Sequence, residues 1–533
     1  MASPVVAVCD GKLKGFQKKN LNGDNFYAFL GIPFGKAPVG ELRFKAPEPA
    51  VPWQGVRNAT VDGDSSYQRN DFTGKIEGSE DCLNLSVYTK TLPSGCNKLK
   101  PVMFWIYGGS FLSGSNKGNL YGPEHLMLED IVLVSVNYRL GFLGFLHLDD
   151  TTLDVHGNAG IKDQQLALKW VQQNIRSFNG DPNNVTIFGE SAGSESVHLH
   201  IVSPSSKGLF HKAILQSGCL LNPWAYSKDY GLEFAKKFKE NVTTEKEALE
   251  VLKKVPVDKI FEEQEKFYAS VSTTDLIAPN IEKPNKSAVI TSHPVELITR
   301  GQYNKVPIII GYNNREGLYV EVVRRLVAAA ENKSPDEEKP EDFDLKLLLL
   351  PGLSEDDPKN KLILKTIRET YLQGPIAQDK FWLPTDYYFV AGIIAATNLH
   401  VNTSHCPIYL YRISLDAGLN LLKKFAKVPN PGTSHGDELG YLFKMEVASK
   451  FLQQGVTEEK ALKQLVKLWA NFAACGNPTP SGSCLRTTWL PAGKDLNFLD
   501  INIELTAGKN PESERRKSWK VIFQKFPAIA NNV

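Results

Sequence analysis

Two long apolar runs in the first third of the chain predict strands that are buried on both faces. Residues Pro101–Tyr107 and Ile131–Tyr138 contain no charged side chain. Continuous apolar runs, as opposed to alternating ones, are typical of a largely parallel sheet. Further strands are predicted at Val5–Val8, Val185–Phe188, Ala213–Gln216, Val306–Ile310 and Ile408–Ile413.

Helices are predicted between these strands. From Asp163 to Phe178 the apolar residues recur at helical spacing, and the sequence Asn-Gly-Asp-Pro at Asn179–Pro182 ends that pattern. A second helix is expected after the Gly-rich turn that follows Phe188. Because strands and helices alternate as in βαβ units, the sequence predicts an α/β fold.

Composition excludes several classes of protein. Of the 533 residues 42% are hydrophobic, and 61 basic side chains face 59 acidic ones, for a formal net charge of +2. This balance argues against a disordered chain and against the broad basic surface of a nucleic-acid binder. No run of apolar residues is long enough to predict a membrane span. The length allows about three or four domains, although α/β folds can run much longer as one unit.

The segment Gly189–Gly193 carries the most informative motif, Gly-x-Ser-x-Gly, between a predicted strand and a predicted helix. The backbone of such a turn is strained and tightly packed, so glycines flank the serine, whose hydroxyl is lifted above the sheet. Ser191 is therefore a candidate nucleophile, with a purely structural turn as the alternative.

A serine hydroxyl is a poor nucleophile at neutral pH, so a histidine base and an acid that orients it should follow. Glu316, in a Gly-rich turn directly after a late predicted strand, is the candidate acid. Four histidines follow the late strands or lie close to them: His293, His400, His405 and His435. His435 is best placed, because it lies in the loop of small residues beyond the strand at Ile408–Ile413.

Acyl transfer also needs backbone N–H donors that stabilise an oxyanion. Such donors come from the residue after the nucleophile and from a glycine-rich loop after an early strand. Ala192 and the turn Tyr107–Phe111 occupy these two places.

Other motifs are spread over nearly the whole chain, at Phe29–Gly35, Ser79–Leu85, Asn137–Arg139, Gly157–Gly160 and Asp163–Gln164. Together with Gly189–Gly193, they make the chain resemble the type-B carboxylesterases of the cholinesterase/carboxylesterase family, most similar to insect α-esterases. The resemblance implies one α/β-hydrolase domain over residues 1–533, with a large, mostly parallel central sheet flanked by helices and with long insertions.

The resemblance also implies roles for site residues. The triad would be Ser191, Glu316 and His435, and the oxyanion hole would be Gly109, Ser110 and Ala192. Glu190 and Ser217 would support the triad, and the substrate pocket would be lined by Trp224, Phe111, Leu318 and Tyr319. Neither a metal nor a cofactor is implied; the expected partners are small-molecule carboxylic esters, with organophosphates as covalent inhibitors.

Departures from the family pattern narrow this expectation. Ser110 stands where a third oxyanion glycine or alanine is usual, and its side chain is expected to narrow the acyl site. Cholinesterases carry a tryptophan for choline between the positions of Trp53 and Trp105, and this chain has none there, which argues against recognition of a quaternary ammonium. Juvenile hormone esterases usually have glutamine before the nucleophile, where this chain has Glu190.

The cysteines and the N-terminus favour the cytoplasm. The seven cysteines are few and odd in number, and no signal peptide is recognisable. Family members often pair the cysteine at Cys82 with one upstream, where this chain has Ser65–Gln68, although Cys82–Cys96 and Cys475–Cys484 remain candidate pairs. Secretion is the alternative, since glycosylation sequons occur at Asn58, Asn84, Asn184, Asn241, Asn285, Asn332 and Asn402. Asn84 and Asn184 adjoin predicted buried strands, where a glycan would not fit.

The predicted function is hydrolysis of carboxylic esters through a serine acyl-enzyme, by a broad-specificity detoxifying, lipid or xenobiotic esterase. The alternatives are a dedicated juvenile hormone or odorant esterase, an organophosphate-sequestering protein, and a non-catalytic cholinesterase-like binding protein. His198 and His200 are expected at the surface on different faces of a helix, so no shared metal is predicted. The acidic stretch Glu331–Asp344 is expected to be a solvated loop.

Overall fold

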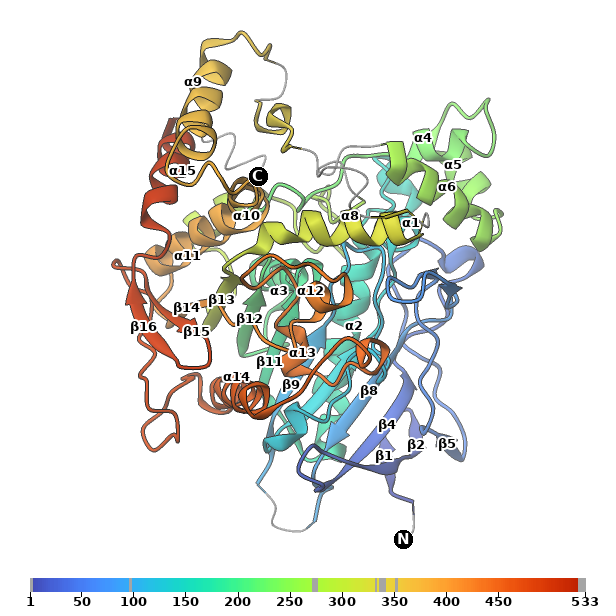
Figure 1. Cartoon of the computed structure of the whole chain (residues 1–533). Helices are drawn as coiled ribbons and strands as arrows, with labels where there is room; N and C mark the ends of the chain where they lie inside the picture. Colours follow the sequence, from blue (N-terminus) through green and yellow to red (C-terminus); the bar gives the residue numbers. More distant parts are fainter. Residues whose placement is uncertain are drawn as a thin grey trace.

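An 11-stranded sheet forms the centre of the molecule (Figure 1). The computed structural model describes residues 3–94, 98–270, 277–330, 333–334, 342–349 and 353–525. In spatial order the strands are β16 (Thr506–Lys509), β15 (Asn497–Ile501), β14 (Ile408–Ile413), β13 (Ile308–Asn313), β12 (Lys212–Gln216), β11 (Gly180–Glu190), β9 (Lys100–Ile106), β10 (Val132–Val136), β8 (Asn84–Thr89), β4 (Asn25–Pro33) and β3 (Phe16–Lys19).

The central strands from β15 to β10 are all parallel, and the strands at both edges of the sheet pair antiparallel. The predicted α/β fold with a mostly parallel sheet is therefore confirmed. In the described part of the chain five further strands lie outside this sheet: β1 (Val5–Val8), β2 (Gly11–Lys14) and β5 (Val56–Asn58) in one small sheet, and β6 (Gln68–Arg69) and β7 (Ile76–Glu77) in another.

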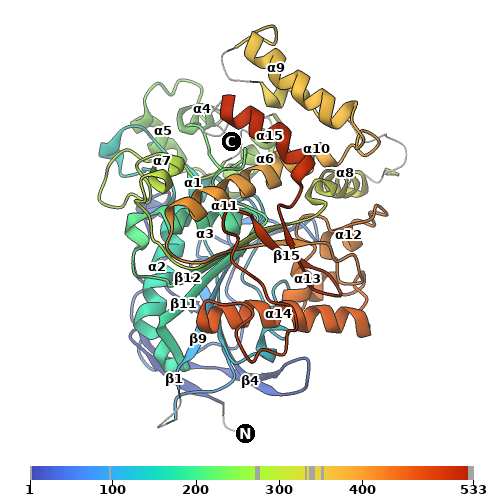
Figure 2. The same cartoon turned by 90° about the vertical axis from the view of Figure 1, so that its left-hand side faces the viewer.

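Helices cover both faces of the sheet. They are α1 (Gly141–Phe145), α2 (Ala159–Asn174), α3 (Ala192–Val202), α4 (Gly231–Lys236), α5 (Glu245–Leu252), α6 (Val257–Ser270), α7 (Pro294–Thr299), α8 (Tyr319–Ala330), α9 (Pro358–Ile367), α10 (Trp382–Thr385), α11 (Ala391–Thr403), α12 (Leu421–Phe425), α13 (Leu439–Leu442), α14 (Val456–Cys475) and α15 (Ser513–Lys525). Figure 2 shows α2 and α3 on one side of the sheet and α13 and α14 on the other. The helices α4–α6, α8–α10 and α15 lie at the end opposite the N-terminus (Figure 1).

The predicted helix after Asp163 and its end are confirmed, but the next strand starts earlier than expected. The helix α2 passes into a 3-10 turn at Ile175–Phe178, and Asn179 then adopts a left-handed conformation with φ of 63°. The strand β11 begins at Gly180, because Gly180 already pairs with Lys100 of β9 before the register shifts at Val185. Polar residues in this segment concealed the strand.

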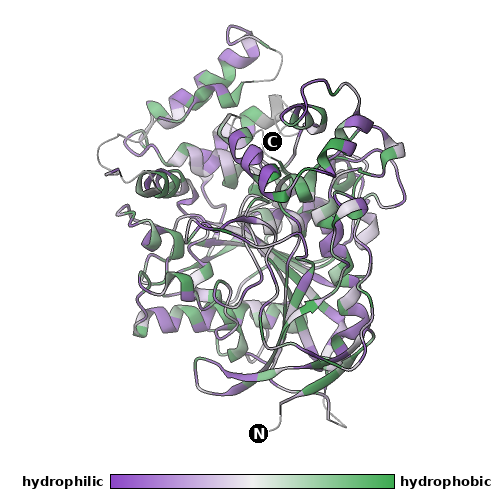
Figure 3. Ribbon diagram, turned by 90° about the vertical axis from the view of Figure 1, so that its right-hand side faces the viewer, coloured by the Kyte–Doolittle hydropathy of each residue, from purple (hydrophilic) through white to green (hydrophobic). Residues whose placement is uncertain are grey.

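Among the described residues the core has one large cluster that extends from Val6 to Ile501, a smaller cluster between α9, α10 and α15, and a third of Val322, Ala426 and Val428. Strands in the middle of the molecule are largely hydrophobic, whereas the outer helices carry both polar and apolar faces (Figure 3). None of the described helices combines the length and the apolar character that crossing a bilayer requires. Most of the acidic stretch 331–344, with Asn332, and also Cys96 lie outside the described residues.

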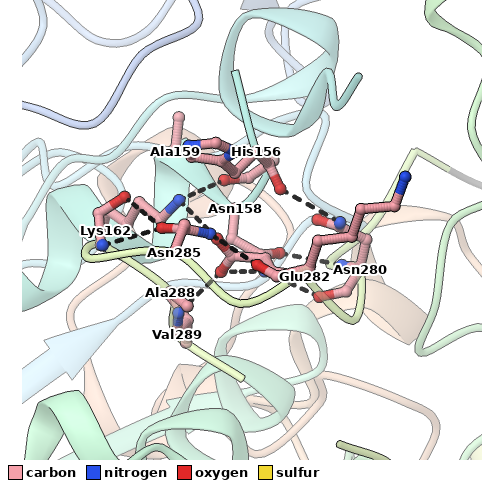
Figure 4. Close-up of polar contacts among 12 residues, drawn as sticks. His156, Asn158, Ala159, Lys162, Asn280, Glu282, Asn285, Ala288 and Val289 are labelled. Atoms are coloured by element: carbon pink, nitrogen blue, oxygen red, sulfur yellow. Dashed lines mark hydrogen bonds and ion pairs between the residues drawn. The ribbon is translucent and has the colours of Figure 1, made fainter. Parts of the chain in front are cut away.

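A buried ion pair joins the segment around Glu282 to α2 (Figure 4). Lys162 Nζ lies 2.8 Å from Glu282 Oε2, and the other carboxylate oxygen accepts hydrogen bonds from Asn158 Nδ2 at 3.0 Å and from the Val289 N–H at 2.7 Å. Asn158 itself has a left-handed backbone with φ of 55°. Buried charges need such partners, so the motif at Gly157–Gly160 has a structural role that sequence reasoning did not assign.

Candidate active site

Ser191 lies at a sharp turn between β11 and α3. Its φ of 58° and ψ of −126° are unfavourable for a residue with a side chain. A Cβ on Gly189 would lie 2.5 Å from the carbonyl carbon of Gly193, and one on Gly193 would lie 2.1 Å from the Ile106 oxygen. Both glycines are therefore required by packing. The Ser191 N–H donates a hydrogen bond of 2.9 Å to the backbone carbonyl oxygen of Gln216 in β12.

The other predicted site residues also follow parallel strands of the sheet. Gly109 follows β9, Ser217 follows β12, Glu316 follows β13, and His435 lies in the loop beyond β14. Because the carboxyl ends of parallel strands meet at the same edge of a sheet, these residues converge above it.

His435 lies between two carboxylates. Its Nδ1 is 2.8 Å from Glu316 Oε2, and its Nε2 is 3.1 Å from Glu190 Oε1. Since Glu190 directly precedes Ser191, Nε2 lies at the nucleophile turn. The second oxygen of Glu316 accepts the Asn313 N–H at 2.7 Å, which fixes the carboxylate toward the imidazole.

The charges around His435 alter its proton affinity. Burial disfavours the imidazolium, but Glu190 and Glu316 outweigh burial and raise the pKa of His435. Burial likewise raises the pKa of Glu190, against the opposing effect of His435. The imidazole and the Glu190 carboxyl therefore titrate as a pair.

Replacing Glu190 by glutamine tests this electrostatic arrangement. A base must be neutral, and Glu190 favours the imidazolium, so the kcat/KM of the wild type should fall on acidification with a midpoint above 6.5. In Glu190→Gln the midpoint should move down by about 1 to 3 pH units. The measurement is the pH profile of kcat/KM for an aryl ester, with exposed Glu446→Gln as the control. An unchanged midpoint would show that Glu190 does not act on His435.

The turn after β9 brings backbone N–H groups next to the nucleophile. Gly109, Ser110 and Phe111 all have positive φ, of 105°, 55° and 59°. A Cβ on Gly108 would lie 2.9 Å from Ser191 Cβ, so this turn packs directly on the nucleophile. Within the described chain, the N–H groups of Gly109, Ser110 and Ala192 have no acceptor. They are free to bind a developing negative charge.

Comparisons with known proteins agree with this geometry. The carboxylesterase family model matches residues 2–519. The chain belongs to the carboxylesterase family. It is 34% identical to the juvenile hormone esterase of Tribolium castaneum, over 95% of this chain and 87% of that protein, and 33% identical to esterase E4 of Myzus persicae, over 93% and 90%.

A solved structure is similar over the whole fold. The crystal structure of juvenile hormone esterase from Manduca sexta, with OTFP covalently attached, aligns with a TM-score of 0.84 and 26% identity, covering 98% of this chain and 100% of that chain. The α/β-hydrolase fold and the activity of a serine carboxylic ester hydrolase follow for this carboxylesterase.

Behind His435 and Glu316 of this carboxylesterase lies a buried polar network that sequence reasoning did not find. Glu438 accepts hydrogen bonds from Gln216 Nε2 at 3.0 Å and from Asn313 Nδ2 at 2.6 Å, and Trp469 Nε1 donates to Gln216 Oε1 at 3.0 Å. Ser217, predicted to support the triad, is buried beside this network and has φ of 56°. The only signal in the sequence was a pair of acids soon after His435, at Asp437 and Glu438.

The four predicted pocket residues have different environments. The Tyr319 ring packs edge-on against His435, with the ring centroids 5.2 Å apart. Trp224 is almost buried, at 8% exposure. Phe111 packs against Phe145 at 4.8 Å, and the side chain of Leu318 is fully buried.

The expectation that His198 and His200 lie at the surface is wrong. Every residue of α3 is buried, because the helix lies between the sheet and the segments that follow it. The two side chains do point to different faces: His198 Nε2 lies 2.9 Å from His400 Nε2, and His200 Nε2 lies 3.0 Å from Gln164 Oε1. Among the described residues no group of three or more His, Cys, Asp or Glu side chains is arranged so that it could hold a metal ion.

Because these histidines are buried, we expect the folded protein to be less stable in acid. Burial lowers the pKa of His200 to about 3 and that of His400 to about 4. The pKa of each histidine is lower in the folded state than in the unfolded state. Its contribution to stability is therefore complete above the unfolded pKa of about 6.5 and is lost as the pH falls below that value. At pH 5 the unfolding free energy should be smaller than at pH 7 by about 2 kcal/mol for each of the two. Denaturant unfolding at pH 5 and pH 7 measures this difference in unfolding free energy. The difference should be smaller in His200→Gln and should be unchanged in the control His405→Gln, at an exposed position.

The cysteines of this carboxylesterase are unpaired in the described part of the chain. Cys475 and Cys484 are both free, so that candidate pair does not form. Cys82 is buried beside Ser66, and burial raises the pKa of its thiol to about 12. Asn84 is also buried, and its Nδ2 donates a hydrogen bond of 2.8 Å to the backbone carbonyl oxygen of Asp64. This agrees with the expectation that a glycan would not fit there.

Proposed function

We propose that Ser191, His435 and Glu316 hydrolyse carboxylic esters in two steps. Ser191 Oγ attacks the ester carbonyl carbon while His435 Nε2 takes its proton, and the N–H groups of Gly109, Ser110 and Ala192 bind the oxyanion. The ester C–O bond then breaks, and the alcohol leaves with the proton from His435. Water attacks the acyl-enzyme, His435 takes the proton of that water, and release of the acid returns it to Ser191.

The single observation that supports this proposal is the position of His435. Glu316 holds Nδ1 at 2.8 Å, and Nε2 reaches the turn that carries Ser191. With Nδ1–H donated to a carboxylate, the proton-accepting nitrogen is Nε2, on the side of the nucleophile.

We further propose that the substrates are a broad range of neutral esters. The support is the combination of Glu190, where juvenile hormone esterases usually have glutamine, with the similarity to the aphid esterase E4. A dedicated juvenile hormone esterase is the second candidate, because the beetle and moth relatives named above carry that name.

A substrate panel separates these two candidates. The purified chain would be assayed for kcat/KM with p-nitrophenyl esters, naphthyl esters and terpenoid methyl esters such as juvenile hormone. Comparable values across all three groups would support the broad esterase. A preference of more than about 100-fold (about 2.7 kcal/mol) for the terpenoid ester would reject broad specificity in favour of the hormone esterase.

A further inference from the structure

The turn that carries Glu316 packs against the short helix α10. The Gly317 N–H donates a hydrogen bond of 2.9 Å to Oγ1 of Thr385, the last residue of α10. A Cβ on Gly317 would lie 2.4 Å from the Phe381 carbonyl oxygen and 2.6 Å from the Thr385 nitrogen. The residue after Glu316 therefore lies directly on the backbone of α10, so that a shift of α10 would move Glu316 with it.

The residue before Glu316 is fixed by the same helix. The Arg315 guanidinium lies over the ring of Trp382, the first residue of α10, with its Cζ 4.4 Å from the ring centroid. The guanidinium also forms an ion pair of 2.5 Å with Asp379. Tryptophan is the aromatic residue that attracts a cation most strongly, and the flat guanidinium stacks well on its face. Both chain neighbours of Glu316 are thus held by α10.

A second arginine, from the C-terminal helix α15, lies over the same ring. Arg515 Cζ is 4.1 Å from the centroid of the Trp382 ring, and α15 runs next to α10 in Figure 2. Arg515 Nε also donates to Asp386 at 2.7 Å, and its Nη1 lies 2.9 Å from Glu512. Two neighbouring guanidinium groups repel each other, and the carboxylates of Asp379, Asp386 and Glu512 offset this repulsion. We call the two arginines and Trp382 the arginine–tryptophan stack.

The segment after α10 contacts the base. The helix continues without a break into a π-helical turn, Asp386–Val390, where the centroids of the Phe389 and His435 rings are 4.4 Å apart. Such turns are rare and occur frequently at functional sites. Glu316 and His435 are therefore both placed against one continuous segment, and the arginine–tryptophan stack fixes the start of that segment.

We propose that the arginine–tryptophan stack positions Glu316 for catalysis, with Trp382 and Arg515 as positioning residues for ester hydrolysis. The proposal rests on the proposed function, because both residues act through Glu316 and His435. With the stack intact, Glu316 Oε2 stays 2.8 Å from His435 Nδ1. Without the ring of Trp382, the turn loses the support of Arg315, and the carboxylate moves away from the imidazole. The C-terminal helix thereby contributes to turnover at a site that it does not itself enter.

The test is Trp382→Leu, which removes the ring but keeps an apolar side chain. With p-nitrophenyl acetate, kcat should fall about tenfold or more while KM stays within about twofold. The acid limb of kcat/KM should move to lower pH, because Glu316 is one of two carboxylates that raise the pKa of His435. Trp382→Phe keeps a ring and should restore most of kcat. The matched control, which should keep full activity, is Trp53→Leu, since Trp53 also lies under an arginine, Arg57, but beside β2.

A double-mutant comparison separates positioning from a general loss of packing. In Glu316→Gln no carboxylate is left to orient, so that adding Trp382→Leu should lower kcat by no more than about twofold. An equal loss from Trp382→Leu in both backgrounds would overturn the proposal, as would an unchanged kcat in folded Trp382→Leu.

A second variant keeps the comparison decisive if Trp382→Leu does not fold. Arg515→Lys keeps a charge beside Asp386 but loses the planar group that stacks on the ring. It should show the same dependence on Glu316 with a smaller loss of kcat, and a loss of equal size in Glu316→Gln would again overturn the proposal. Full activity in Glu316→Gln alone would instead reject the proposed function.

Discussion

Replacing Ser191 by alanine is expected to lower kcat for an aryl ester by about 10⁴- to 10⁶-fold. Alanine removes the Oγ atom that forms the acyl-enzyme, so only binding and the oxyanion donors remain to accelerate attack by water. Because alanine has no larger side chain than serine, the strained turn at Ser191 should form as before. The loss should therefore appear in kcat and not in stability.

The measurement is steady-state hydrolysis of p-nitrophenyl acetate, with denaturant unfolding of the same samples. Ser449→Ala, a change of the same type at an exposed position, serves as the control and should keep full activity. Turnover by Ser191→Ala within about tenfold of the wild type would contradict an acyl-enzyme at this residue.

The second large effect is expected for Glu316→Gln, with a loss of about 10³- to 10⁴-fold in kcat. Glu316 accepts two hydrogen bonds, from the Asn313 N–H and from His435 Nδ1. Glutamine has the same shape, but its amide group must face one of these two donors, and it no longer stabilises the imidazolium. The imidazole is then favoured in the tautomer whose proton lies on Nε2, where the base has to accept one.

Comparison with Glu316→Asp shows whether the charge or the position of the carboxylate at residue 316 contributes more to kcat. Aspartate keeps the charge but is shorter by one methylene, so its loss should be smaller than that of glutamine. The acid limb of kcat/KM should also move to lower pH in Glu316→Gln, because one carboxylate that raises the pKa of His435 is gone. A glutamine variant within tenfold of the wild type would exclude Glu316 as the orienting acid.

The parallel strands and the nucleophile turn could be predicted from sequence, because each is encoded locally. Pro101–Tyr107 is an uninterrupted apolar run, and the glycines at 189 and 193 are required because a Cβ there would lie only 2.5 and 2.1 Å from backbone atoms. Glu316 and His435 were proposed from chain order after late strands, which the parallel topology brings to one edge of the sheet.

Other features could not be predicted, because they depend on packing between distant segments. The side chains of α3 gave no sign that His198 would lie against His400, which is 202 residues away. The π-helical turn at Asp386–Val390 has no sequence pattern of its own, since it is held by Trp224, Asn222 and Arg515 from elsewhere. Phe389 was missed for that reason, although an aromatic residue beside a catalytic base is a natural part of a substrate site.

The order in which the site residues occur along the chain also constrains synthesis of the enzyme. The turn at Gly109 is translated early, whereas β14 and the loop with His435 come about 300 residues later or more. A nascent chain on the ribosome therefore exposes an incomplete sheet edge, to which β13 and β14 have not yet been added. Such an edge can pair with other chains, so chaperone binding during translation should persist until the edge strand β16 has emerged.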